Sequence, residues 1–262
     1  MVTFLVGLKR RTAKILQSNQ TNRLTGFVLR SQFARVMTCS AGDRTLHLWS
    51  PTARIRSRNS TLATKEPMTI RWLQSLGPED VLWDIGANIG LYTCFAAIAG
   101  PTVVAFEPSV FNMEALARNV FLNGVTSKVI VVPLPVSHIG SQPALLSFAT
   151  DELGDSQTVF ASLRRDNGEV LSAKFESQVP GIALDHLITH LRIPAPTHLK
   201  IDVDGNEPEI LRSSPKLLNL VSQVLTEVPM FHGAREQIND TLKSVGFQLV
   251  ESSRRNELWC RV

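Results

Sequence analysis

The chain has 262 residues, 44% of them hydrophobic and 19% charged, and its formal net charge is +4. This composition is typical of a globular protein that buries a sizeable core, and it excludes a disordered or fibrous chain. No run of about 18 apolar residues occurs, so no membrane-spanning helix is expected.

The cysteines and the first residues bear on the compartment. Cys39, Cys94 and Cys260 lie far apart, without the clustering of a zinc site or a disulfide framework. The apolar stretch at the N-terminus is too short for the core of a signal peptide, and its charges follow it. We therefore predict a cytoplasmic protein in which Cys94 is a small core residue.

Positive charge is concentrated at the start of the chain. Residues 1–80 hold 13 Lys and Arg against 4 Asp and Glu, a net charge of +9, whereas the remainder has a net charge of −5. Most such segments are solvated surfaces, but some bind nucleic acid, an anionic membrane or an acidic substrate. We interpret residues 1–64 as a basic N-terminal extension or cap, within which ARIRSR at 53–58 suggests a strand with a charged outer face.

Beyond the extension, apolar runs short enough for buried strands alternate with helical patterns. Helices are predicted over 66–76, 91–99, 112–123, 184–191, 208–220 and 235–245, and strands over 81–85, 102–106, 128–134, 197–203 and 223–228. Residues 247–250 and 258–262 are predicted to pair as a terminal hairpin, and 141–180 form a polar insertion. The pattern predicts an α/β, Rossmann-like three-layer sandwich, with a mostly parallel sheet and an antiparallel C-terminal hairpin strand.

An acid and a glycine-containing turn follow the first of these strands. The sequence reads VLWDIGANIGLY, with Asp84 near the strand end and Gly86, Asn88 and Gly90 in the turn. Ligands of open parallel sheets bind beyond the carboxyl ends of the strands, and glycines permit close approach of a ligand to the backbone. The spacing G-x-N-x-G lacks the G-x-G-x-x-G of a pyrophosphate site. This favours a ligand with a smaller polar tail, and Asp84 would suit an ammonium group.

A second acid follows the next strand. Glu107 comes 17 residues after Gly90, close to the spacing at which an acid reaches a ribose diol. A carboxylate suits that position because it accepts hydrogen bonds from two adjacent hydroxyls. The structural alternative for the two motifs is a tight turn followed by a helix-capping acid.

The segment LKIDVDGNE places three acids, Asp202, Asp204 and Glu207, at another strand end. Repulsion among them is costly unless they lie near water, a cation or a protonatable ligand. The next strand ends at Glu227, and His232 comes five residues later. Because parallel strands end on one edge of a sheet, we expect these acids to share a rim with the earlier motifs.

These segments resemble the FkbM-type family of S-adenosylmethionine-dependent methyltransferases. The matching pieces are LWDIGANIGLYT at 82–93, VVAFEPS at 103–109, VSHIG at 136–140, VPGIALDHLI at 179–188 and LKIDVDGNEPEIL at 199–211. DIGANIG and KIDVDGNE, in this order, are the most specific of them. The resemblance covers residues 65–262, which we expect to form the methyltransferase domain, and it implies S-adenosylmethionine as the cofactor.

Seven positions of these segments match the family's cofactor-binding residues. They are Asp84, Gly86, Asn88 and Gly90 for the methionine part, Glu107 for the ribose hydroxyls, and Val136 and Ser137 near the adenine. The resemblance also implies that Asp202 lies next to the transferred methyl group. Trp83 and Asp204 depart from the family pattern, where smaller aliphatic residues and Glu are usual.

Methyl transfer to a hydroxyl requires alignment of the acceptor and removal of its proton. We predict Asp202 or His232 as the base and Lys200 as an orienting residue. The resemblance suggests O-methylation of a sugar or small metabolite, and the 141–180 insertion is a plausible wall for this acceptor. No metal is expected, although a divalent cation on Asp202, Asp204 and Glu227 is an alternative.

Two other classes of function remain open from the sequence. One is a nicotinamide-dependent oxidoreductase on a similar sheet, which the missing G-x-G-x-x-G disfavours. The other is a non-catalytic module that binds nucleic acid or membrane through its basic N-terminal third. A nucleic-acid methyltransferase is disfavoured, since aromatic residues are few, at 6%, and no N-P-P-Y-like motif occurs. No pattern indicates an oligomeric state.

Overall fold

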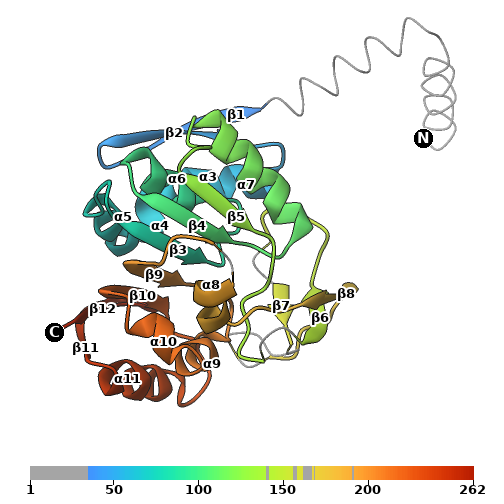
Figure 1. The fold of residues 1–262 in the computed structure, drawn as a ribbon. Helices are drawn as coiled ribbons and strands as arrows, with labels where there is room; N and C mark the ends of the chain where they lie inside the picture. Colours follow the sequence, from blue (N-terminus) through green and yellow to red (C-terminus); the bar gives the residue numbers. More distant parts are fainter. Residues whose placement is uncertain (1–34, 140–141, 156–157, 162–166, 168, 191) are drawn as a thin grey trace, which may run out of the picture.

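A seven-stranded sheet forms the centre of the computed structural model, which describes residues 35–139, 142–155, 158–161, 167, 169–190 and 192–262. Its strands are β3 (Val81–Ile85), β4 (Thr102–Phe106), β5 (Val129–Val132), β9 (His198–Ile201), β10 (Gln223–Glu227), β11 (Phe247–Ser253) and β12 (Asn256–Arg261). Their order is β11-β12-β10-β9-β3-β4-β5 (Figure 1). The strands from β10 to β5 are parallel, and the β11–β12 hairpin joins antiparallel to them, so the predicted sheet is confirmed.

Helices cover both faces of this sheet. One face carries α5 (Pro67–Gln74), α6 (Leu91–Ile98) and α7 (Val110–Leu122), and the other carries α8 (Leu184–His190), α9 (Glu207–Arg212), α10 (Pro215–Leu218) and α11 (Ala234–Ser244) (Figure 1). Successive side chains of a strand point to opposite faces. Leu82 therefore packs with the first set, whereas Trp83 and Ile85 pack with the second. The predicted three-layer sandwich is confirmed.

The predicted strand over 53–58 is wrong. The segment before the central sheet instead forms a hairpin of β1 (Val36–Ala41) and β2 (Arg44–Trp49), followed by the helices α3 (Ala53–Ser60) and α4 (Leu62–Lys65). The Thr52 side chain accepts a hydrogen bond from the Ile55 N–H and so caps α3. Ile55 and Asn59, one turn apart, are both buried. In residues 53–58, arginine alternates with small or apolar residues as in a strand. This alternation therefore did not reveal that the segment is a helix.

The hairpin docks onto the helices through one buried cation. The Arg44 guanidinium donates to the carbonyl oxygens of Leu73, at 3.3 Å, and Phe95, at 3.0 Å. These carbonyls lie in the last turns of α5 and α6, where backbone acceptors lack helical partners and positive charge is favoured. The Trp49 N–H also donates to the Asn119 side chain of α7, at 2.7 Å. The described part of the N-terminal segment is therefore packed against the domain.

The insertion forms a small antiparallel sheet beside the carboxyl ends of the central strands (Figure 1). Its strands are β6 (Pro143–Phe148), β7 (Thr158–Phe160) and β8 (Phe175–Pro180). The helix predicted over 208–220 is instead divided into α9 and α10, because Pro215 begins α10 and cannot donate within a continuous helix. Cys39, Cys94 and Cys260 are free thiols, and Cys94 is buried in the core as predicted. Among the described residues, no helix is long and apolar enough to cross a membrane.

Candidate functional site

A cavity of about 390 Å³ lies at the carboxyl ends of the central strands. From β3 the chain continues to β4 and β5, which extend the sheet toward one edge. The later strands β9 and β10 extend it from β3 toward the other edge. The strand order therefore reverses beside β3, which is where ligands of such sheets bind. The lining includes Ile85, Phe106, Glu107, Asp202, Glu227 and, from the insertion, Leu146, Val159 and Phe160. The insertion thus forms one wall of the cavity, and its role beside the acceptor stays a prediction.

The glycines of the turn after β3 are required for packing within the protein. Gly86 and Gly90 have φ angles of +84° and +79°, which side-chain-bearing residues rarely adopt. A Cβ on Gly86 would lie 1.9 Å from the Asp202 carbonyl oxygen, and one on Gly90 would lie 2.3 Å from a Leu116 methyl carbon. We expected a ligand in this space, but protein atoms fill it. Gly86 still lines the cavity, so its role in cofactor binding stays a prediction.

Asp84 lies below the cavity and does not line it. Its side chain is 0% exposed, accepts a hydrogen bond of 2.6 Å from the Thr93 hydroxyl, and lies 3.2 Å from the Lys200 Nζ. Asp84 and Lys200 are partners in the parallel register of β3 and β9, so both side chains project from the same face of the sheet. The structure therefore does not support the predicted contact of Asp84 with an ammonium group, because its carboxylate is already paired inside the protein.

Glu107 joins the turn after β3 to the start of α7. Its carboxylate accepts hydrogen bonds of 2.8 Å from the backbone N–H groups of Asn88 and Ser109, one on each oxygen. Burial raises the pKa of Glu107 to about 7, and these N–H donors oppose the shift. The residue is 5% exposed and lines the cavity, so it holds the loop beside the cavity, and its contact with ribose hydroxyls stays a prediction.

Val136 and Ser137 differ in their placement. Val136 lines the cavity with Leu134 and Pro135, whereas Ser137 does not belong to the lining. The Ser137 hydroxyl accepts a hydrogen bond of 3.1 Å from the Ile139 N–H, and its backbone N–H donates to the Ile182 carbonyl at 2.9 Å. Val136 therefore lines the cavity, and its contact with adenine stays a prediction, while Ser137 stabilises the segment behind it.

Lys200 connects Asp84 to Asp202. Its Nζ lies 3.2 Å from Asp84 and 3.6 Å from Asp202, and the side chain is 3% exposed. Burial opposes the charge of Lys200, but the two carboxylates outweigh it and hold the pKa of the amine above its usual value. Lys200 lines a smaller cavity of about 50 Å³ that shares Gly86, Asn88 and Asp202 with the main one. It therefore acts on the site through Asp202.

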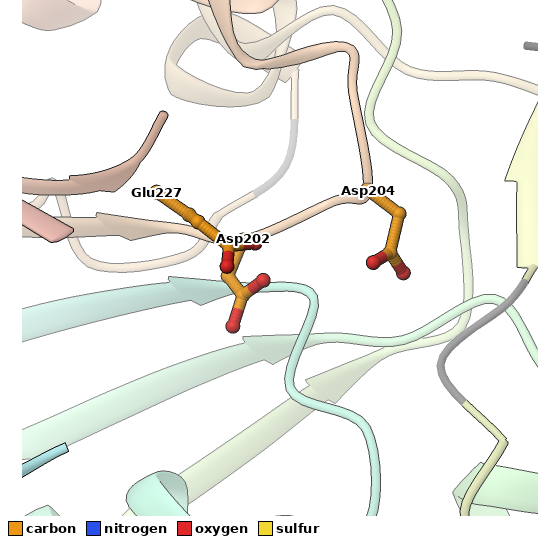
Figure 2. Close-up of side chains that lie close together, drawn as sticks. All are labelled: Asp202, Asp204 and Glu227. Carbon is orange, nitrogen blue, oxygen red and sulfur yellow. The ribbon is translucent and has the colours of Figure 1, made fainter. Parts of the chain in front are cut away.

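Asp202 and Glu227 form a carboxyl pair at the ends of β9 and β10 (Figure 2). Burial raises the pKa of Glu227 to about 9, and the negative charge of Asp202 adds to the effect. Burial also acts to raise the pKa of Asp202, but Lys200 and the hydrogen bond from Glu227 outweigh it and lower that pKa. Near neutral pH the pair therefore holds one proton, mainly on Glu227, and Asp202 is the ionised member.

Asp204 lies beside this pair, and each of the three acids offers a ligand atom within 4.8 Å of the others (Figure 2). Glu207, the remaining acid of the segment, is 1% exposed and points back into its own loop. Its two oxygens accept hydrogen bonds from the Val203 N–H, at 2.8 Å, and the Gly205 N–H, at 3.0 Å. Repulsion among the acids is thus reduced, because Glu207 binds backbone N–H donors and Glu227 carries a proton.

The structure does not bring His232 into the site. The residue lies in the turn after β10, is exposed, and lines neither of the two cavities described above. Of the three predicted catalytic residues, Asp202 and Lys200 are therefore brought together, and His232 is separate from them.

Several cavity residues escaped the sequence analysis. Arg58, Lys65 and Arg255 add positive charge to the lining, and Asp155 and Asn112 come from the insertion and α7. The Asp155 carbonyl oxygen accepts hydrogen bonds from the side chains of Asn112, at 2.9 Å, and Asn88, at 3.0 Å. Lys65 begins the stretch that resembles the family. No short motif marks the other residues, since their association depends on segments far apart in the chain, and the positive charge of residues 1–80 was the signal available for Arg58.

Residues 84–249 match the model of the family described as Methyltransferase FkbM domain. The chain belongs to this family. The matched segment includes the end of β3 and all of β4, β9 and β10, whose ends form the cavity. The predicted family is therefore confirmed, and the nicotinamide-dependent alternative is not favoured.

Curated relatives carry methyltransferase names. The chain is 28% identical over 156 residues to the hexuronic acid methyltransferase AglP of Haloferax volcanii, a match that covers 60% of the chain but only 59% of AglP. It is 27% identical to the 31-O-demethyl-FK506 methyltransferase FkbM of Streptomyces tacrolimicus, over 67% of the chain and 75% of that relative. The methyltransferase sdnD of Sordaria araneosa is also 27% identical, with 63% and 73% covered.

A solved structure with a similar arrangement is the magnesium protoporphyrin IX methyltransferase ChlM of Synechocystis PCC 6803 with bound SAM. It is 12% identical, the match covers 84% of the chain and 87% of that structure, and the TM-score is 0.48. Likeness of this degree does not bear on function.

Proposed function

We propose that the FkbM-family chain transfers a methyl group from S-adenosylmethionine to a hydroxyl oxygen of a sugar or small metabolite. The observation that carries this proposal is the cavity at the strand ends, where Glu107 lies on one side of β3 and the Asp202–Glu227 pair lies on the other. One side supplies a candidate nucleoside contact, and the other supplies an ionised carboxylate for proton transfer.

The residues of the cavity fit the proposed donor. Its volume of about 390 Å³ lies within the range of small-molecule sites. The Glu107 Oε2 atom accepts one N–H, from Asn88, and keeps a lone pair for a ribose hydroxyl, whereas Oε1 accepts from both the Ser109 N–H and the Asn112 side chain. Phe106 and Val136 supply apolar surface beside Glu107 for an adenine ring. The carboxylate of Asp202 would favour the positive charge of a sulfonium or an ammonium group.

The catalytic work of the chain is to orient an acceptor and to take its proton. The donor, when bound, supplies a methyl group on a positively charged sulfur. Asp202 is the proposed base, because it is ionised near neutral pH and lines the cavity. Lys200 is a positioning residue that holds Asp202 through the 3.6 Å ion pair. Glu227 shares its proton with Asp202 and so limits the charge of the pair.

The acceptor is proposed from the cavity walls and the relatives. Leu146 and Phe160 give the cavity lining an apolar part, which suits the carbon skeleton of a sugar or metabolite. The name of AglP refers to hexuronic acid and supports a carbohydrate acceptor, and the name of FkbM refers to 31-O-demethyl-FK506 and supports methyl transfer to oxygen. A small-molecule or carbohydrate partner is therefore favoured over a nucleic acid.

We also propose a division of the chain into two parts and a cytoplasmic location. Residues 65–262 would carry the methyltransferase domain, and residues 1–64 would be a basic extension or cap whose described part covers α5, α6 and α7. A cytoplasmic location would give access to the methyl donor.

The most direct functional test uses cell extract as the source of acceptors. Extract is incubated with the protein and a donor with an isotopically labelled methyl group, and products are identified by mass spectrometry. We expect one or a few labelled compounds with the methyl group on oxygen, and none with the Asp202→Asn variant. Label on nitrogen or carbon would contradict the proposed acceptor class, and no label in any compound would contradict the activity.

A further inference from the structure

The helices before the family-matched segment bring positive charge to the site. Arg58 of α3 and Lys65 of α4 line both the main cavity and the smaller one beside it. The family match begins at residue 84, so both cations come from outside it. Among the described residues, Arg255 is a third cation that lines the main cavity, and it lies 3.1 Å from Glu227.

Arg58 differs from its neighbours in its pairing. Lys65 lies 3.1 Å from Glu66. The Arg58 side chain, by contrast, has no hydrogen bond or ion pair within the described part of the chain, and its charge acts on the Asp202 carboxylate only at longer range, where it lowers the pKa of Asp202. It is half-buried, so its five N–H donors lose part of their hydration without a protein acceptor in return. A half-buried guanidinium without a protein acceptor is suited to bind a planar, anionic ligand that enters the cavity.

The position of Arg58 is fixed by the packing of α3. Ile55 and Asn59, on either side of Arg58 in the sequence, are fully buried, and the Asn59 side chain donates to the Ser50 hydroxyl at 2.8 Å. The Arg58 stem passes close to Gly154, because a Cβ added to that glycine would lie 3.9 Å from the Arg58 Cδ. The helix therefore holds the stem against the cavity wall, beside Gly86 and Asn88 of the turn after β3.

We propose that Arg58 binds the carboxylate of a molecule held in this cavity, so that α3 completes the site from outside the family-matched segment. The inference rests on the proposed function. Two sources share the required chemistry: the amino-acid end of the methyl donor, and an acidic group on the acceptor. The position of Arg58 beside the turn after β3 favours the donor, since the resemblance places the methionine part at this turn.

Calorimetric titration tests whether Arg58 binds the carboxylate of the methyl donor. S-adenosylhomocysteine and its decarboxylated analogue are titrated into the wild type, Arg58→Ala, Arg58→Lys and the control Arg56→Ala, which removes a charge from the same helix at a residue outside both cavities. A charge-assisted hydrogen bond predicts that Arg58→Ala binds S-adenosylhomocysteine roughly 10-fold to 100-fold more weakly. The decarboxylated analogue should bind Arg58→Ala and wild type alike, Arg58→Lys should be intermediate, and Arg56→Ala should match wild type. Thermal unfolding confirms that each variant is folded.

A second titration tests whether Arg58 instead binds an acidic group on the acceptor. Glucuronate and glucose are titrated into the complexes of wild type and Arg58→Ala with S-adenosylhomocysteine. A loss of glucuronate binding alone, with unchanged S-adenosylhomocysteine affinity, would support an acidic acceptor as the source of the carboxylate. The inference is overturned if Arg58→Ala matches wild type in both titrations. Failure of the wild type to bind S-adenosylhomocysteine would instead refute the proposed function, and the inference with it.

Discussion

The loops after β4 and β9 are built in the same way but face different surroundings. Each contains a buried glutamate whose two oxygens accept backbone N–H groups: Glu107 binds Asn88 and Ser109, and Glu207 binds Val203 and Gly205. Glu107 lines the cavity, whereas Glu207 does not belong to its lining.

The comparison of Glu107 with Glu207 distinguishes two roles of a buried glutamate, which are to hold a loop and to face the cavity. The loop after β9 divides the two tasks, because Glu207 fixes the backbone and leaves Asp202 to face the cavity. In the loop after β4, we propose that the Glu107 carboxylate performs both tasks. A buried acid near a cavity therefore cannot be assigned to ligand binding from its burial alone, and paired substitutions in the two loops distinguish the roles.

The largest effect is expected in the loop after β9. Asp202→Asn should reduce kcat roughly 10²-fold to 10⁴-fold, since an amide cannot accept the proton of the acceptor. The measurement is the initial rate with the acceptor identified from cell extract at saturating donor, and Asp204→Asn is the control on the same loop. Equal, small losses in the two variants would show that Asp202 is not the base.

A glycine substitution tests the contact between the two halves of the site. Gly86→Ala should lower the free energy of unfolding by about 2–5 kcal/mol, because its Cβ would meet the Asp202 carbonyl oxygen at 1.9 Å and φ is +84°. Gly124→Ala is the matched control, with φ +67° and nothing within 4 Å of the added Cβ, and it should cost only about 1 kcal/mol. Urea unfolding measures both, and similar losses would contradict the close contact.

The glutamate pair gives the direct comparison between the loops. Glu107→Gln and Glu207→Gln should each lower the free energy of unfolding by about 1–3 kcal/mol, because each carboxylate oxygen accepts a buried backbone donor. Only Glu107→Gln should also weaken S-adenosylhomocysteine binding, by about 10-fold. Unfolding and calorimetry on the same samples separate the two effects. A comparable loss of affinity in Glu207→Gln would remove the distinction drawn between the loops.

The pH dependence of stability offers a finer test of Glu207. Burial raises its pKa to about 7 from an ordinary value of 4.5, so the folded state binds more protons than the unfolded state between these values. The contribution to stability is therefore full below about pH 4.5 and is lost as the pH rises through about 7. Relative to wild type, Glu207→Gln should remove a slope of at most about 1.4 kcal/mol per pH unit in this window. Parallel stability curves of the two proteins from pH 5 to 8 would contradict the raised pKa.

Local patterns predicted the frame of the site well. The strands at 81–85 and 102–106 have the predicted bounds, because each is a mainly apolar run that is followed by a residue that interrupts the run, Gly86 or Glu107. The position of Glu107 at a strand end followed from the same reasoning. Features that depend on a short run of sequence were therefore accessible without the structure.

Features that depend on register and distant packing were not accessible. Asp84 matches the family's cofactor contact in sequence, but the register of β3 with β9 places it opposite Lys200, which neutralises it inside the sheet. Arg58 reaches the cavity only because α3 folds over a turn that begins 28 residues later. The helical period of α3 was itself obscured by its arginines.

The central claim is that the cavity at the strand ends holds S-adenosylmethionine. Calorimetric titration of wild-type protein with S-adenosylhomocysteine, and separately with NAD, tests it most directly. We predict saturable binding of one S-adenosylhomocysteine per chain and no heat of binding with NAD. Absence of S-adenosylhomocysteine binding, or tighter binding of NAD, would contradict the account.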